Sequence, residues 1–207
     1  MIRVLIVDDH ALFRQGLRMV VEQESDIEVV GEAGSGAEAV PVAGTTKPDV
    51  VLMDVRMPGG GGIAACPAVL QAAPAARVVM LTISDEEDDL YNALTAGAVG
   101  CLRKDMSIEH IADAVRAVHD GKCLVSPSIA SRLLRGRAAG VVPGGPAPAG
   151  STSATRQQTE ILEQLARGLD DSCIAQAMGV SEDVVRAGVR AVLAGLRERQ
   201  LHRTVSG

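Results

Sequence analysis

Aromatic residues are almost absent from this chain of 207 residues, which has one phenylalanine (Phe13), one tyrosine (Tyr91) and no tryptophan. Hydrophobic residues nevertheless make up 47% of the sequence. Any core must therefore be built from Val, Leu, Ile, Ala and Met. The length and composition allow one large domain or two small ones.

The chain also lacks long hydrophobic runs and closely spaced cysteines. No segment approaches the roughly 20 apolar residues of a membrane span, and no cleavable signal pattern is visible. The four cysteines (Cys66, Cys101, Cys123 and Cys173) are scattered without metal-ligand spacing, so we interpret them as reduced thiols. We therefore expect a cytoplasmic protein with no membrane partner.

Three short apolar runs each end at charged residues. Such runs have the length and continuous Val/Ile/Leu character of strands that are buried on both faces. Because ligands of an open parallel sheet bind beyond the carboxyl ends of its strands, we expect these charged residues to meet at one edge. The runs are Val4–Val7, followed by Asp8 and Asp9; Val50–Met53, followed by Asp54; and Val99–Leu102, followed by Arg103 and Lys104.

The predicted edge thus combines the carboxylates of Asp8, Asp9 and Asp54 with the ammonium group of Lys104. Three like charges need a cation beside them, and hard oxygen ligands suit Mg²⁺. A single aspartate here could instead cap the next helix, and Lys104 could be a solvated residue at a strand end. The coincidence of all four favours a carboxylate–metal–lysine site, whose expected chemistry is phosphoryl transfer.

Strand-like and helix-like patterns alternate up to about residue 120. Five repeats of a strand followed by a helix predict an α/β fold with a doubly wound, five-stranded parallel sheet. The expected strands are Val4–Val7, Ile27–Val30, Val50–Met53, Val78–Leu81 and Val99–Leu102, and the expected helices are Leu12–Glu24, Gly36–Ala43, Ile63–Ala72, Glu86–Ala96 and Ile108–His119.

The rest of the chain differs in composition. Residues 1–120 carry 9 basic and 19 acidic residues, whereas residues 121–207 carry 11 basic and 7 acidic residues. Residues 136–153 are rich in Gly, Pro, Ala and Ser, which is typical of a flexible linker. A short basic helix is expected before it, and the region after it predicts a small all-α domain. Its expected elements are Thr155–Arg167, Ser172–Met178 and Ser181–Leu193, with a helix-turn-helix over Ala175–Val185.

Several of these motifs together resemble a known protein family. The segments VLIVDDH, VVLMDVRMP, VVMLT and GAVGCLRKD are similar to the receiver domain of response regulators, and EILEQLARGLDDSCIAQAMGVSEDVV is similar to a LuxR-type helix-turn-helix. The whole chain, except for the linker, resembles two-component transcription factors of the NarL/FixJ type. This resemblance implies a receiver domain over residues 1–121, a helix extension and linker over 122–153, and a helix-turn-helix domain over 154–207.

The resemblance also implies a role for each residue of the predicted site. Asp54 would accept a phosphoryl group from a sensor histidine kinase, and Thr82 and Lys104 would contact the phosphoryl oxygens. The Mg²⁺ ligands would be Asp8, Asp9, Asp54 and the backbone carbonyl of Arg56. The expected protein is a DNA-binding regulator and not primarily an enzyme, and it would act as a homodimer or as a heterodimer with a related regulator.

The chain departs from the family pattern beside the predicted site. The usual MPxMDG segment reads MPGGGG (residues 57–62), and we expect this glycine run to be mobile. The usual switch aromatic corresponds to Cys101, and Ile83 follows Thr82 where a small residue is usual, so we expect Ile83 to crowd the pocket. His10 could be a ligand or a base, but a position at the start of the first helix is the preferred interpretation.

The second domain departs further, because residues 151–207 carry 7 arginines and 7 acidic residues. DNA binding depends on neutralising phosphates, so this charge balance is unfavourable. Arg186 and Arg190 share a helix face and are the expected DNA contacts. The usual fourth helix would be short, at about Leu201–Val205. An alternative function therefore stays open: a signalling adaptor whose second domain binds a protein.

Overall fold

The computed structural model describes residues 1–83, 87–138 and 153–205. Contacts divide the chain into two compact units, residues 1–124 and residues 125–207. The finer domain boundaries expected from the sequence stay a prediction. We describe each unit by itself.

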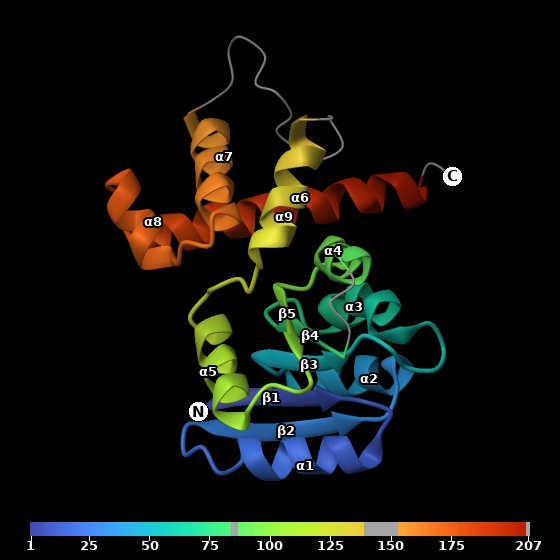
Figure 1. Cartoon of the computed structure of the whole chain (residues 1–207). Coiled ribbons are helices and arrows are strands. Elements are labelled where there is room, and N and C mark those ends of the chain that lie inside the picture. Colours follow the sequence, from blue (N-terminus) through green and yellow to red (C-terminus); the bar gives the residue numbers. More distant parts are fainter. Residues whose placement is uncertain (84–86, 139–152, 206–207) are drawn as a thin grey trace. The chain divides into compact units, whose positions relative to one another are not determined.

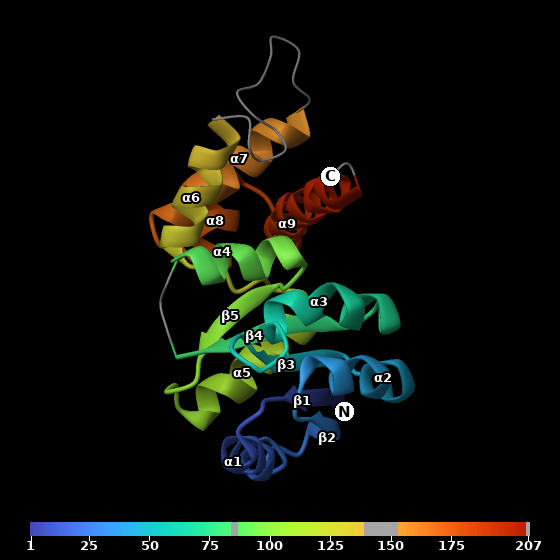
Figure 2. The same cartoon turned by 90° about the vertical axis from the view of Figure 1, so that its right-hand side faces the viewer.

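The first unit is a five-stranded parallel sheet with helices on both faces, which confirms the predicted fold class (Figures 1 and 2). The strand order is β2-β1-β3-β4-β5, and every neighbouring pair is parallel. The strands are β1 (Ile2–Val7), β2 (Ile27–Ala33), β3 (Val50–Asp54), β4 (Arg77–Thr82) and β5 (Gly100–Arg103), and the helices are α1 (Ala11–Val21), α2 (Gly36–Thr46), α3 (Gly61–Ala72), α4 (Glu87–Ala96) and α5 (Ile108–His119).

Each face of the sheet has its own hydrophobic core. Leu17 of α1 and Val115 of α5 belong to one cluster, whereas Ala43 of α2, Val69 of α3 and Ala93 of α4 belong to the other. All five residues of β3 are buried because helices cover both faces of this central strand. This two-sided burial explains why the strand is a continuous apolar run rather than an alternating one.

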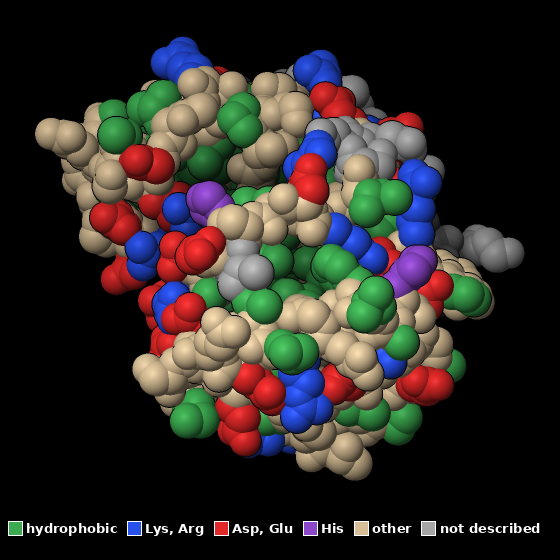
Figure 3. Space-filling model, turned by 60° about the horizontal axis from the view of Figure 1, so that its bottom comes forward, with side chains coloured by type: hydrophobic (Ala, Val, Ile, Leu, Met, Phe, Trp, Pro, Cys, Tyr) green, Lys and Arg blue, Asp and Glu red, His purple; other side chains and the backbone are tan. Residues whose placement is uncertain are grey.

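On the face shown in Figure 3, acidic and basic side chains are interspersed rather than segregated by sign. Arg116 of α5, for example, pairs with Glu24 at 2.5 Å and with Asp26 at 2.7 Å. The hydrogen bonds from Arg116 lower the pKa of Asp26 to about 2. These pairs tie α5 to the connection between α1 and β2.

The second unit consists of helices, as expected. They are α6 (Pro127–Ala138), α7 (Ser153–Ala166), α8 (Asp171–Met178) and α9 (Glu182–Val205). In the described parts of the chain, no helix has both the length and the apolar composition of a membrane span. The unit has its own core, whose largest fully buried side chains are Ile129, Leu133, Ile161, Leu162 and Ile174.

The last helix differs from the expectation. The sequence suggested a helix over Ser181–Leu193 and a separate short helix near Leu201–Val205, but α9 is a single helix of 24 residues. Its sequence has no proline, and Gly195 alone does not interrupt it because one glycine costs only about 1 kcal/mol relative to alanine.

Candidate functional site

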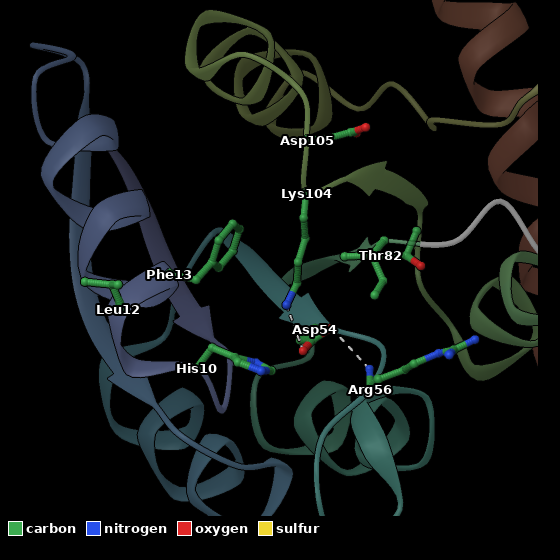
Figure 4. A pocket seen from close by; sticks show the side chains of 9 residues that line it. His10, Leu12, Phe13, Asp54, Arg56, Thr82, Lys104 and Asp105 are labelled. Carbon is green, nitrogen blue, oxygen red and sulfur yellow. Dashed lines mark hydrogen bonds and ion pairs between the residues drawn. The ribbon is translucent and has the colours of Figure 1, made fainter.

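Four residues of the predicted site lie at one edge of the sheet, at or just beyond the carboxyl ends of the strands, and Figure 4 shows three of them, Asp54, Thr82 and Lys104. Asp8 follows β1, Asp54 ends β3, Thr82 ends β4 and Lys104 follows β5. The exposed fractions of Asp8, Asp54 and Thr82 are 0%, 4% and 3%. The parallel register therefore brings together residues that are far apart in the sequence, as predicted.

Lys104 is the cation at the centre of this cluster. Its Nζ atom lies 2.6 Å from Asp8 Oδ2 and 2.8 Å from Asp54 Oδ2. Burial alone would lower the pKa of Lys104, but its hydrogen bonds to the two carboxylates outweigh burial and the pKa is raised. Burial raises the pKa of Asp54, and the charge of Asp8 adds to this effect. Lys104 therefore compensates part of a negative charge that would otherwise be unstable here.

The ring of Phe13 packs beside the same lysine, a contact that the sequence analysis missed. The Lys104 Nζ atom lies 4.7 Å from the centre of the ring. A cation over an aromatic face is stabilised by the ring quadrupole. The sequence held one indication of this contact, because the single phenylalanine stands in the first turn of the helix that follows Asp8 and Asp9.

The carboxylates form a cluster that could hold a cation. Ligand atoms of Asp8, Asp9, His10 and Asp54 all lie within 4.8 Å of one another. Asp8 Oδ2 and Asp9 Oδ1 are buried oxygens; the first lies 2.6 Å from Lys104 Nζ and the second 2.9 Å from His10 Nδ1. Clustered carboxylate oxygens are the ligands that a hard divalent cation prefers, so the residues fit such an ion.

His10 lies at the rim of the cluster rather than inside it. It is the residue immediately before α1, as expected, and its side chain is 70% exposed. Its Nδ1 atom is 2.9 Å from Asp9 Oδ1. An exposed imidazole paired with a carboxylate is a weaker candidate for a ligand than the buried aspartates.

The loop after β3 is shaped by its glycines. The backbone N–H of Arg56 donates to Asp54 Oδ1 at 3.1 Å. Gly61 has a φ of 75°, which other residues rarely adopt. Gly62 lies so close to the Asp54 carbonyl oxygen that a Cβ atom would collide with it. At these two positions, therefore, the local backbone requires glycine.

The side chain of Ile83, just after the end of β4, is 72% exposed. Together with Leu12 and Phe13 it lines a cavity of about 530 Å³ that also includes Asp54 and Lys104. That Ile83 crowds the pocket stays a prediction.

The thiol of Cys101 lies half-buried in β5. Burial raises its pKa to about 12, and the nearby charges of Cys66 and Asp89 contribute. The thiol is therefore neutral at physiological pH.

Of the acidic run Asp85–Asp89, residues 85 and 86 lie outside the described residues, whereas the last three begin α4.

In the second unit, α8 and α9 form the predicted helix-turn-helix. The side chain of Asp170 accepts a hydrogen bond from Cys173 N at the start of α8, and Gly179 ends this helix with a φ of 65°. Val185, Val189 and Val192 of α9 are buried. Gly188 also faces inward, because a Cβ atom there would collide with Ile161 of α7.

The two arginines expected to contact DNA have different surroundings. Arg186 is surrounded by carboxylates: its Nη2 atom is 2.7 Å from Glu182 Oε2, its Nη1 atom is 3.5 Å from Asp183 Oδ1, and its Nε atom is 3.6 Å from Asp171 Oδ2. Arg190, one turn later, is exposed. Three carboxylates around one arginine were not anticipated, because Asp171 comes from another helix.

Comparisons with known proteins agree with this architecture. Residues 4–116 match the family described as the response regulator receiver domain. The chain is 37% identical to the uncharacterized transcriptional regulatory protein YxjL of Bacillus subtilis over 194 residues, which cover 93% of this chain and 88% of that protein. It is 34% identical to the nitrate/nitrite response regulator protein NarP of Escherichia coli, over 95% of this chain and 89% of that protein.

Solved structures give the same result. The signal receiver domain of the putative response regulator NarL from Mycobacterium tuberculosis is 38% identical, with a TM-score of 0.56, over 58% of this chain and 98% of that chain. The response regulator ChrA of a heme-sensing two-component system is 32% identical, with a TM-score of 0.52, over 97% of this chain and 98% of that chain. The chain therefore belongs to the two-component response regulators of the NarL/LuxR family.

Proposed function

We propose that Asp54 accepts a phosphoryl group from a phosphohistidine of a sensor histidine kinase and that this event controls DNA binding by the second unit. The observation that carries the proposal is the buried Asp54 carboxylate, whose Oδ2 atom lies 2.8 Å from Lys104 Nζ at an open cavity. A carboxylate held beside a cation is suited to accept a group whose transition state spreads negative charge over its oxygens.

The transfer itself needs little covalent chemistry from the protein. An oxygen of the Asp54 carboxylate attacks phosphorus, the bond between phosphorus and the donor nitrogen breaks, and its electron pair leaves with the donor imidazole. Lys104 and the Thr82 hydroxyl group then contact the phosphoryl oxygens. Asp8, Asp9, Asp54 and the Arg56 carbonyl are the proposed ligands of Mg²⁺, which neutralises phosphoryl charge when it is bound.

Phosphorylation can be tested with a small donor. The full chain, incubated with acetyl phosphate and Mg²⁺, should gain the mass of one phosphoryl group by intact mass spectrometry. Asp54→Asn should abolish the gain. The matched control is Asp49→Asn, which removes a carboxylate just before the other end of β3 and should gain mass like the wild type. A gain that persists in Asp54→Asn would refute the assignment of the acceptor.

We further propose that Arg186 and Arg190 of α9 contact DNA and that a homodimer places two α9 helices about one DNA turn apart. A heterodimer with a related regulator is the alternative assembly. Since Glu182 lies 2.7 Å from Arg186, DNA phosphates must displace this carboxylate before they reach the arginine. Arg190, the second proposed contact, is exposed.

The double variant Arg186→Ala/Arg190→Ala should lower DNA affinity about 10-fold or more and reduce the salt dependence of binding by about two phosphate contacts, because it removes two cations. Fluorescence anisotropy with labelled DNA at several salt concentrations measures both effects. The matched control, Arg156→Ala/Arg167→Ala, removes two exposed arginines in and beside α7 and should leave affinity nearly unchanged.

A second candidate function is a signalling adaptor whose second unit binds a protein. The carboxylates around Arg186 and the balanced charge of residues 151–207 favour it. Wild-type protein that binds no DNA at low salt, with or without phosphorylation, would support the adaptor and contradict the first proposal.

A further inference from the structure

Arg56 connects the predicted phosphoacceptor to helix α4. Its backbone N–H donates to Asp54 Oδ1 at 3.1 Å. Its guanidinium group donates through Nη2 to Asp89 Oδ2 of α4 at 3.3 Å. Figure 4 shows that the Arg56 side chain extends away from Asp54. One residue thus contacts the acceptor carboxylate through its backbone and α4 through its side chain.

The partner of this arginine lies in the first turn of α4. Glu87, Asp88 and Asp89 begin the helix, and Asp89 is 25% exposed. Asp89 is also close enough to Cys101 of β5 for its charge to raise the pKa of that thiol. Because the Cys101 thiol is neutral, it carries no charge that a change at Asp54 could attract or repel. Arg56 does carry one.

The Arg56–Asp89 pair is weak enough to be exchanged. The arginine side chain is 56% exposed, and ion pairs in such surroundings contribute little. A phosphoryl group adds about −1.5 to −2 charge and three acceptor oxygens, whereas Asp89 offers one negative charge. Guanidinium groups bind such oxygens in a bidentate manner, so a phosphoryl group next to the Arg56 backbone competes well for its side chain.

We propose that Arg56 is a positioning residue that holds α4 through Asp89, and that a phosphoryl group on Asp54 draws the guanidinium group away and releases the first turn of α4. This inference rests on the proposed phosphorylation of Asp54 and adds the contact by which the event reaches a neighbouring helix. Lys104 is a less suitable carrier because it already pairs with both Asp8 and Asp54 before any phosphoryl group arrives.

Hydrogen exchange of α4 in the full chain tests the proposal, with beryllofluoride and Mg²⁺ as the phosphoryl mimic. In the wild type, amides of residues 87–96 should exchange about two- to five-fold faster once the mimic is bound, the range that loss of one exposed ion pair allows. Asp89→Asn should show this faster exchange without the mimic and little further change with it. Asp89→Glu keeps the carboxylate and should behave like the wild type.

Glu87→Gln is the matched control, because it removes a negative charge from the same exposed helix turn. Both changes weaken the favourable interaction of carboxylates with the start of a helix, but Asp89 also pairs with Arg56 at 3.3 Å. Equal exchange in Asp89→Asn and Glu87→Gln would therefore overturn the coupling.

Intact mass after treatment with acetyl phosphate separates the two proposals. If the chain gains a phosphoryl group but α4 exchanges at the same rate with and without beryllofluoride, the coupling through Arg56 is refuted and the proposed function stands. If the chain gains no phosphoryl group, both proposals are refuted.

Discussion

Replacing Lys104 by methionine should lower the free energy of unfolding of the first unit by about 3 kcal/mol at pH 7 without divalent cations. The lysine pairs with Asp8 and Asp54, whose exposed fractions are 0% and 4%. Methionine preserves much of the side-chain volume but leaves two buried carboxylates beside each other without their cation. Urea unfolding followed by circular dichroism measures the loss.

The loss should depend on pH in a defined direction. Burial raises the pKa of Asp54, so the folded protein binds a proton there more readily than the unfolded chain does. In Lys104→Met, protonation at low pH relieves the repulsion, and the difference from the wild type should shrink as the pH falls from 7 toward about 4. Added Mg²⁺ should recover part of the stability at pH 7, because the cation binds the folded carboxylates.

A matched lysine variant controls for the loss of a charge. Lys47 is exposed, and its Nζ atom donates to the carbonyl oxygen of Ala72. Lys47→Met should therefore change the free energy of unfolding by less than about 1 kcal/mol. Equal effects of the two substitutions would show that the pairs of Lys104 with Asp8 and Asp54 do not stabilise the fold.

The second large effect is expected for Gly62→Ala. A Cβ atom at this position would collide with the Asp54 carbonyl oxygen and approach the Met53 side chain to 2.9 Å. The backbone at the end of β3 must shift, and such overpacking costs about 1–3 kcal/mol. Because the shifted carbonyl belongs to the proposed acceptor, the rate of phosphorylation by acetyl phosphate should also fall. Urea unfolding and time-resolved intact mass measure the two losses.

Gly16→Ala provides the opposite case within the same unit. Gly16 is an exposed residue inside α1, and a Cβ atom there would meet no atom within 4 Å. Alanine should stabilise the helix by about 0.5–1 kcal/mol and leave phosphorylation unchanged. If Gly62→Ala were as stable as Gly16→Ala, the close approach to Asp54 would not constrain the loop.

The sheet edge could be predicted because each site residue stands beside a strand with an unmistakable hydrophobic pattern. Asp54 follows Val50–Met53 directly, and parallel strands place their carboxyl ends together. The expected mobility of the MPGGGG segment came from its glycine content, and the expectation for Ile83 came from a family pattern. Only coordinates show that Gly62 packs against a carbonyl group and that Ile83 is mostly exposed where it lines the cavity.

Other features depend on contacts between distant residues. The packing of Phe13 against Lys104 joins the first helix to the end of the last strand, which no local pattern encodes. The same holds for Asp171 beside Arg186, because they lie on different helices. The length of α9 was underestimated because the family pattern suggested a break that the residues after Leu193 do not contain.

The scarcity of aromatic residues leaves the protein with a built-in optical probe. Tyr91, the single tyrosine, is half-buried on α4, and the chain has no tryptophan to quench its emission by energy transfer. Tyrosine fluorescence of the unlabelled protein therefore comes from this one helix. Its intensity can be followed in a stopped-flow cell without a dye or an engineered chromophore.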